Sequence, residues 1–193
     1  MKPRHETEVK LRVESPRRLG RKLSELGLAP VSARHFERNI LFDFKGSPLR
    51  KAGSLIRLRF EGSRGLVTFK GASRRSSRYK VRPEIEITIE DCGALRAIFE
   101  RLGLRETFRY EKYRTGFAPR RGSRRAGSPL LVFDETPIGD FIELEGPAAW
   151  INRVARALGY GRRDYITGSY AALYLAWRRK RRGQPRNMVF RKS

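Results

Sequence analysis

"HETEVKLRV", residues 5–13, is the stretch that decides the fold. Charged and apolar side chains alternate in it, the charged set being Glu6, Glu8 and Lys10 and the apolar set Val9, Leu11 and Val13. A period of two residues predicts a β-strand with one apolar face and one charged face. A charged strand face is ordinarily solvated, because ionised side chains are rarely buried unless they are paired or bind a metal. One strand cannot decide between solvent and chemistry, so the same pattern must be sought elsewhere.

The composition is dominated by positive charge. Lys and Arg total 44 against 20 acidic residues in 193, for a formal net charge of +24, which indicates affinity for phosphates, nucleic acid or an acidic surface. The length suits one domain, or one domain with a tail. Cys92 is the only cysteine, which excludes an intramolecular disulfide and a cysteine-cluster zinc site. We expect a cytoplasmic protein, because the sequence has neither a signal-peptide pattern nor an apolar run of about 20 residues.

Turn and capping signals divide the chain into short elements. Strands are predicted at 5–13, 33–44, 53–62, 66–71, 78–91, 106–119, 129–135 and 140–146, and helices at 16–26, 92–103, 147–158 and 168–182. Hairpins or short helices link most of the strands. The predicted class is therefore α+β, an eight-stranded antiparallel sheet curled into a barrel with helices packed outside. Residues 1–177 form the predicted domain, and 178–193 a basic, flexible tail.

The alternation of the first strand recurs on the later ones, with charges segregated by sign. Acidic pairs stand at Glu6/Glu8, Glu84/Glu86 and Glu143/Glu145, basic pairs at Arg57/Arg59 and Lys112/Arg114, and Lys70 and Asp134 extend the two sets. If these were solvent-exposed strands whose acids and bases simply formed ion pairs, there would be no reason for one strand to repeat an acid at every second position. If the apolar faces pack on the helices, the charged faces converge on the lumen of the barrel.

A lumen with clusters of both signs indicates a specific chemistry. Clustered carboxylates repel one another unless a hard cation joins them, and Mg²⁺ and Mn²⁺ prefer oxygen ligands. Clustered Lys and Arg need an anion, and both bind phosphate oxygens well. A divalent metal together with a polyphosphate satisfies both clusters at once.

At this point the sequence resembles the CYTH superfamily, also called triphosphate tunnel metalloenzymes. The hallmark E-x-E-x-K of that family is matched by Glu6-Thr7-Glu8-Val9-Lys10. The resemblance continues in order through "IRLRF", "VTFKG", "RPEIEITIED", "FRYEKYRTGF", "FDETPIGDFIELEG" and "SYAALY", and covers roughly residues 5–177. One E-x-E-x-K would be weak evidence, whereas the ordered set is specific.

The resemblance implies roles for residues of this chain. Metal would be bound by Glu6, Glu8, Asp134, Glu143 and Glu145, with Mg²⁺ or Mn²⁺ as the cofactor. Phosphates would be bound by Lys10, Arg57, Arg59, Lys70, Lys112 and Arg114, and Glu6, Glu8 and Lys10 would form the catalytic set. Glu84 and Glu86 match an acidic pair to which we assign no definite role. No nucleophilic side chain is required, because metal-activated water or a ribose hydroxyl would attack.

Three functions stay open at this stage. The first is a triphosphatase acting on inorganic or organic triphosphate, and the second is a class IV adenylyl cyclase converting ATP to cyclic AMP and pyrophosphate. The third is a polyanion-binding module without turnover, which the +24 charge favours and the metal-facing acids oppose. The basic tail is expected to be solvated, with weak contact to nucleic acid or polyphosphate as the alternative. No membrane contact is expected, and monomer and homodimer are both open.

Overall fold

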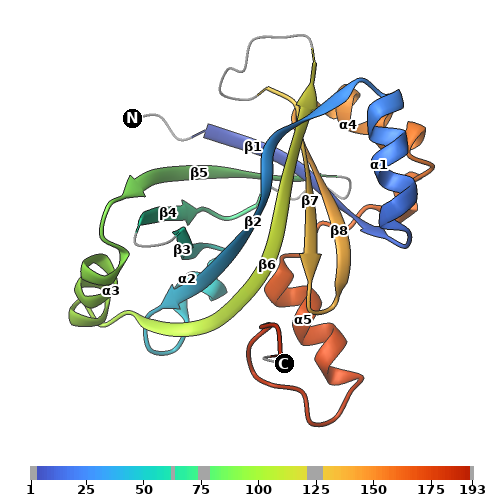
Figure 1. The fold of residues 1–193 in the computed structure, drawn as a ribbon. Coiled ribbons are helices and arrows are strands. Elements are labelled where there is room, and N and C mark those ends of the chain that lie inside the picture. Colours follow the sequence, from blue (N-terminus) through green and yellow to red (C-terminus); the bar gives the residue numbers. More distant parts are fainter. Residues whose placement is uncertain (1–3, 62–63, 74–78, 121–127, 192–193) are drawn as a thin grey trace.

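A computed structural model describes residues 4–61, 64–73, 79–120 and 128–191 of the chain. Its elements are β1 (Arg4–Val13), α1 (Pro16–Glu25), β2 (Leu28–Asp43), α2 (Pro48–Lys51), β3 (Leu55–Glu61), β4 (Arg64–Lys70), β5 (Lys80–Ile89), α3 (Cys92–Arg101), β6 (Arg105–Pro119), β7 (Leu130–Thr136), β8 (Gly139–Glu145), α4 (Ala148–Ala157), the 3-10 turn η1 (Arg162–Asp164) and α5 (Tyr170–Arg179). In Figure 1 the strands β2, β6, β7 and β8 run beside one another, and β3, β4 and β5 cross them.

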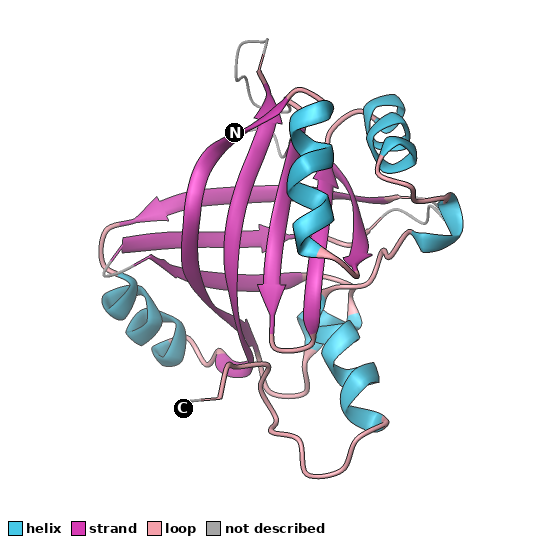
Figure 2. Ribbon diagram, turned by 45° about the vertical axis from the view of Figure 1, so that its right-hand side comes forward, coloured by secondary structure: helices cyan, strands magenta, loops and turns pink. Residues whose placement is uncertain are grey.

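The strands form a closed barrel in the order β1-β5-β4-β3-β2-β6-β7-β8. Every neighbouring pair is antiparallel. β1 completes the ring, because it pairs with β5 over residues 4–8 and with β8 over residues 8–13. Figure 2 shows the strands enclosing a central space with the helices outside. The predicted α+β class, an eight-stranded antiparallel barrel with external helices, is confirmed.

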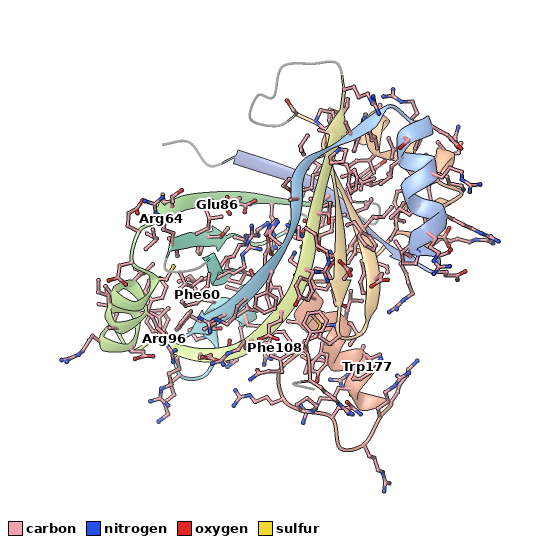
Figure 3. The ribbon with its side chains drawn as sticks, in the orientation of Figure 1. Phe60, Arg64, Glu86, Arg96, Phe108 and Trp177 are labelled. Carbon is pink, nitrogen blue, oxygen red and sulfur yellow. The ribbon has the colours of Figure 1, made fainter. Side chains whose placement is uncertain are left out.

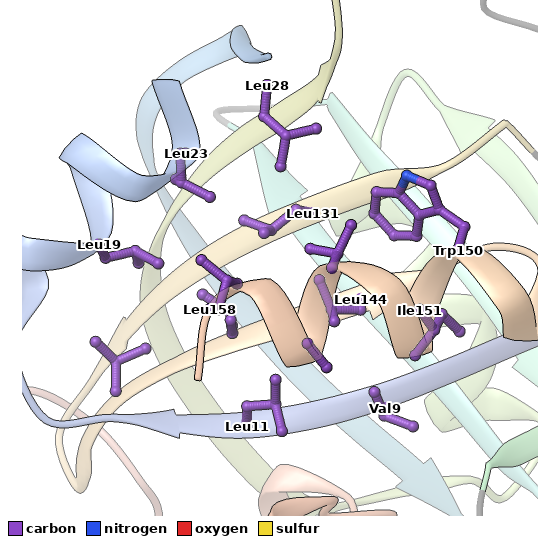
Figure 4. Packing of buried hydrophobic residues seen from close by; sticks show 14 residues of the cluster. Val9, Leu11, Leu19, Leu23, Leu28, Leu131, Leu144, Trp150, Ile151 and Leu158 are labelled. Carbon is purple, nitrogen blue, oxygen red and sulfur yellow. The ribbon is translucent and has the colours of Figure 1, made fainter. Parts of the chain in front are cut away.

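The apolar face of β1 points outward and packs under two helices. Val9, Leu11 and Val13 are buried in a cluster with residues of α1 and α4, as Figure 4 shows. The helices contribute Leu19, Leu23, Trp150, Ile151 and Val154 to this cluster. Burying a side chain of this size stabilises the fold by about 1.5–3 kcal/mol. This packing turns the other face of β1, with Glu8 and Lys10, toward the lumen.

Two smaller clusters cover other parts of the barrel. α3 packs on β2, β3 and β4 through a cluster that contains Phe42, Leu58 and Cys92. α5 packs on β6 and β8 through Tyr170, Tyr174, Phe108 and Phe141. Among the helices of the described residues, none combines the length and the apolar character that crossing a membrane requires.

Most elements differ from their predicted bounds by one to three residues, and the differences at the starts of β2 and α5 have a local cause. β2 begins at Leu28 rather than at residue 33, because its first residues pair with the far end of β6. Pro30 conceals this part of the strand in the sequence, and the register shifts there, between Pro30 and Ser32 and again before His35. α5 begins at Tyr170 rather than at 168, since the Ser169 side chain caps it by accepting from the amide of Ala172.

The segment after α5 returns to the barrel, although the sequence predicted a flexible tail over 178–193. Met188 is fully buried and forms a parallel bridge with Tyr110 of β6. The amide of Glu111 donates to the Met188 carbonyl at 2.9 Å, and the Met188 amide donates to the Arg109 carbonyl at 3.0 Å. The Tyr174 hydroxyl donates to the carbonyl of Pro185 at 2.8 Å. The residues near Met188 are therefore part of the packed structure, which corrects the tail prediction for them.

Candidate functional site

The charged strand faces line one cavity of about 570 Å³ inside the barrel, which we call the lumen cavity. Of the side chains that were assigned from the sequence and can be described, all but Asp134 line it, namely Glu8, Lys10, Arg57, Arg59, Lys70, Glu84, Glu86, Lys112, Arg114, Glu143 and Glu145. Figure 3 draws the side chains and labels Glu86 on β5, which lines the cavity, and Phe60 on β3, which packs against the α3 cluster. The alternation along each strand thus separates lumen from outer core.

Three carboxylates come together at the β1–β8 ladder. Glu8 lies directly opposite Glu145, and Lys10 opposite Glu143, so the two-residue period of each strand places all four on one face. One oxygen from each of Glu8, Glu143 and Glu145 lies within 4.8 Å of the others. Glu8 and Glu143 are buried, with 8% and 7% of their surfaces exposed. We call these residues the acid triad.

Lysines from two strands contact the acid triad. The Lys10 ammonium donates to Glu143, and Lys80 of β5 donates to Glu8 at 2.6 Å. Lys10 also lies 4.3 Å from the centre of the Tyr170 ring, which closes this part of the lumen from α5. Lys10 therefore connects the triad with the basic side of the cavity.

Asp134 is the second acidic centre, and it is fully buried. It accepts from Arg114 in a bidentate pair, both contacts being 2.7 Å, and from Lys112 at 3.0 Å. The Tyr170 hydroxyl donates to the same carboxylate at 2.7 Å. Arg114 bridges the two centres, since it also donates to Glu143 at 2.6 Å. The structure thus sets Asp134 among cations rather than in the triad, and its assignment as a metal ligand stays a prediction.

The opposite wall of the lumen, on β3, β4 and β5, mixes both signs. Lys70 lies 3.2 Å from Glu84, its cross-strand partner. Arg57 donates to the Thr68 hydroxyl at 3.0 Å, and that hydroxyl donates to Glu86 at 2.8 Å. These contacts hold Arg57 against the wall. The acidic pair of Glu84 and Glu86 thus orients the bases of its own wall.

The sequence analysis missed several lumen residues that obey the same alternation. Lys80 and Arg82 precede Glu84 and Glu86 at two-residue spacing, and both line the cavity, as do Tyr110 and Tyr170. Glu37 and Asn39 on β2 are fully buried and share the inward face. The period-two rule could have found all but Tyr170, which enters from α5. The side chain of Glu6 lies outside the described residues, although its backbone pairs with Arg82, so its role stays a prediction.

Burial and ion pairing shift the pKa values of several of these groups in opposite directions. Burial lowers the pKa of Lys10, but the carboxylates of Glu143 and Glu8 outweigh burial and raise it above its usual value. Burial raises the pKa of Glu143, yet Lys10 and Arg114 outweigh it and hold that pKa well below the usual range. Burial lowers the pKa of Lys80, and the attraction of Glu8 offsets this only in part. The charged forms of Lys10 and Glu143 are thus favoured, whereas Lys80 loses its proton more readily than a free lysine.

A closed antiparallel barrel with charges of both signs inside defines a tunnel-like class of binding or catalytic protein. The family model described as "CYTH domain" matches residues 4–167, nearly the whole chain. The chain belongs to the CYTH domain family, and the resemblance seen in the sequence is confirmed.

Individual relatives support the same assignment. A protein of Methanocaldococcus jannaschii named "Putative adenylate cyclase" is 26% identical over 178 residues, covering 87% of this chain and 97% of that protein. Among solved structures, one from Vibrio parahaemolyticus described with the same words has a TM-score of 0.74 at 17% identity, covering 90% of this chain and 99% of that one. A Hippeastrum protein described as a putative adenylyl cyclase with dominant triphosphatase activity has a TM-score of 0.60 at 18% identity, covering 89% and 96%. At these identities the structures support the fold alone.

Proposed function

We propose that the protein is a divalent-metal-dependent triphosphatase that hydrolyses an inorganic or organic triphosphate in the lumen cavity. The observation that carries the proposal is the acid triad lying in the same cavity as the inward-facing bases of five strands. A buried acidic cluster and a buried basic cluster within reach of one ligand match a metal bound to a polyphosphate. The chemistry of this reaction rests mainly on positioning and charge stabilisation.

The acid triad fits a hard divalent cation. It offers only carboxylate oxygens, which Mg²⁺ and Mn²⁺ prefer, and the oxygens are close enough to share one ion. Glu8, Glu143 and Glu145 would hold the metal, and the sequence assigns Glu6 and Asp134 to it as well. When bound there, the metal would lower the pKa of a water and neutralise phosphate charge.

The basic residues supply the phosphate contacts. Arg57, Arg59 and Lys70 would bind from the β3–β4 wall, and Lys112 and Arg114 from β6. Arginine can bind phosphate oxygens in bidentate fashion, whereas lysine offers a point charge. Lys10 lies between the triad and these bases, so we place it at the phosphate that reacts. Tyr170 lines the cavity beside Lys10.

Adenylyl cyclase activity is the second candidate, because the Methanocaldococcus jannaschii relative carries that name. The two activities share the charged lumen and differ in the attacking group, water for hydrolysis and the ribose hydroxyl for cyclisation. The relative described with a dominant triphosphatase activity supports hydrolysis as the first choice for this chain.

One assay decides between the candidates. The purified protein is incubated with inorganic tripolyphosphate, thiamine triphosphate or ATP, each with Mg²⁺, with Mn²⁺ and with EDTA, and the products are identified. Orthophosphate that forms only with metal supports the triphosphatase, and cyclic AMP with pyrophosphate supports the cyclase. Tight binding of tripolyphosphate without any product, with or without metal, contradicts both enzymes and supports a polyanion-binding module.

A further inference from the structure

Glu37 is a buried carboxylate beneath the basic wall of the lumen. It lies on the inward face of β2 with none of its surface exposed, so it cannot touch a ligand in the cavity. Its carboxylate oxygens lie 3.2 Å from Arg59, 3.4 Å from Lys112 and 3.9 Å from Arg114. All three of these cations line the lumen cavity. His35 approaches the same carboxylate at 3.5 Å from the exposed end of the strand.

The contacts of Glu37 are ionic rather than specific hydrogen bonds. Neither of its oxygens has a hydrogen-bond partner within the described residues. A buried carboxylate without such bonds is costly unless nearby charges compensate it. Burial raises the pKa of Glu37, but Lys112, Arg114 and Arg59 outweigh burial and hold that pKa far below its usual value. The side chain is therefore a fixed negative charge behind the cations.

The three cations depend on Glu37 to different degrees. Lys112 and Arg114 also bind Asp134, and Arg114 binds Glu143. Arg59 has no ion pair with a carboxylate other than Glu37 in the described part of the chain. Burial and the neighbouring Arg57 lower the pKa of Arg59, so the surroundings other than Glu37 disfavour the charged form of Arg59. Removing Glu37 would therefore leave Arg59 uncompensated while Lys112 and Arg114 keep other anchors.

We propose that Glu37 is a positioning residue of the site, which holds Arg59 in place and, by its own charge, limits how tightly the lumen cavity binds polyphosphate. This inference rests on the proposed function. A phosphate would contact the far side of the same cation heads, so Glu37 repels it from roughly 7 Å. A unit charge at that distance in a protein interior changes the affinity of an anion by at least about tenfold. The repulsion grows with the charge of the ligand.

The test compares Glu37→Gln with the wild type in binding and unfolding experiments. Without ligand, Glu37→Gln should melt at least about 6 °C lower, because one partner of a buried ion cluster is lost. By calorimetric titration it should nevertheless bind inorganic tripolyphosphate about tenfold more tightly or better, and gain less for orthophosphate. Glu37→Asp keeps the charge and should bind tripolyphosphate within about threefold of the wild type.

A matched control separates this role from a loss of stability. Asp43 is also a buried acid on β2, but it accepts only from the backbone amides of Phe44, Leu49 and Arg50. Asp43→Asn should lower the melting temperature and leave the affinity for tripolyphosphate unchanged. If the wild type binds tripolyphosphate and Glu37→Gln binds it equally or more weakly, the role proposed for Glu37 is overturned, but the proposed function is not. A wild type that does not bind tripolyphosphate overturns the proposed function together with it.

A second variant keeps the proposal testable if Glu37→Gln does not fold. The double variant Glu37→Gln/Arg59→Met removes the carboxylate together with the cation that depends on it. It should fold and recover at least half of the melting temperature lost by Glu37→Gln, since no uncompensated Arg59 remains. A double variant as unstable as the single one contradicts the pairing and overturns the proposal.

Discussion

The hydroxyl of Tyr170 donates to the carboxylate of Asp134 at 2.7 Å, inside the barrel. Tyr170 belongs to the last helix and Asp134 to β7, so this bond ties α5 to the bases that Asp134 anchors. Burial and the charges of Asp134 and Glu143 raise the pKa of Tyr170 well above its usual value. The protonated form of the hydroxyl, which donates this bond, is therefore favoured.

Tyr170→Phe should destabilise the protein by about 1.5–3 kcal/mol, as expected for a hydrogen bond to a charged acceptor. Tyr174→Phe is the matched control on the same helix, because the Tyr174 hydroxyl donates to a neutral carbonyl, and it should cost only about 0.5–1.5 kcal/mol. Urea unfolding of the two variants measures both values. Equal losses would show that the charge of Asp134 adds nothing to the bond.

Glu8→Gln should lower metal-dependent turnover of tripolyphosphate by at least about 100-fold, since it removes a charged oxygen ligand from the acid triad. We expect the same of Glu6→Gln from the sequence pattern. Glu135→Gln is the control, because Glu135 lies on β7 and pairs with Arg34 at the exposed surface. It should keep wild-type turnover. Wild-type rates in Glu8→Gln would exclude the metal assignment.

Arg57→Ala should weaken binding of tripolyphosphate by about 10- to 100-fold, the value of one charge-assisted contact of about 1.5–3 kcal/mol. Lys10→Ala and Arg59→Ala should weaken it as well, the Arg59 variant more so because Glu37 then repels the ligand unopposed by that cation. If these residues reach the terminal phosphate, the loss is larger for tripolyphosphate than for pyrophosphate. Titration calorimetry measures it, with exposed Arg34→Ala as a control of unchanged affinity.

The period-two alternation predicted most of the lumen, because a strand with one buried face must turn its other face inward when the sheet closes. It could not show that β1 lies between β5 and β8, since strand order depends on contacts between distant segments. That order brings Glu8 opposite Glu145. Glu37 was missed although it obeys the alternation, because the positions two residues before and after it hold His35 and Asn39 rather than a second acid. Tyr170 was missed because it enters the lumen from α5, outside the period-two pattern of the strands.

Acid should destabilise the protein partly through Glu37. Its folded-state pKa lies below the usual value of 4.5, so the unfolded chain binds the proton more readily. The stability that Glu37 contributes is therefore fully present above about pH 5 and is lost as the pH falls through the folded-state pKa. We expect the difference in unfolding free energy between wild type and Glu37→Gln to be constant from pH 7 to about 5.5 and to shrink below pH 4. A difference that grows on acidification would contradict this sign.

The last prediction concerns the C-terminal segment, where the sequence pattern misled. Eight basic residues in 178–193 predicted a solvated tail. Yet the run "NMVF" within it is apolar, Met188 is fully buried between α5 and β6, and the Phe190 amide donates to Glu111 of β6. β6 also carries Lys112 and Arg114, so this packing supports the strand that bears two of the proposed phosphate ligands.

Met188→Ala should therefore destabilise the protein by about 2–5 kcal/mol, the usual cost of a large-to-small change in a core. A second variant, Arg181→Gln/Arg182→Gln, tests the charge of this segment separately from its packing. Both arginine side chains are exposed, so the variant should leave stability and turnover unchanged. That variant should bind a long polyphosphate with a shallower salt dependence, because fewer counterions are released. Urea unfolding and retention on an anionic resin across a salt series measure the two effects. If Met188→Ala unfolds like the wild type, the segment is the independent tail that the charge pattern predicted.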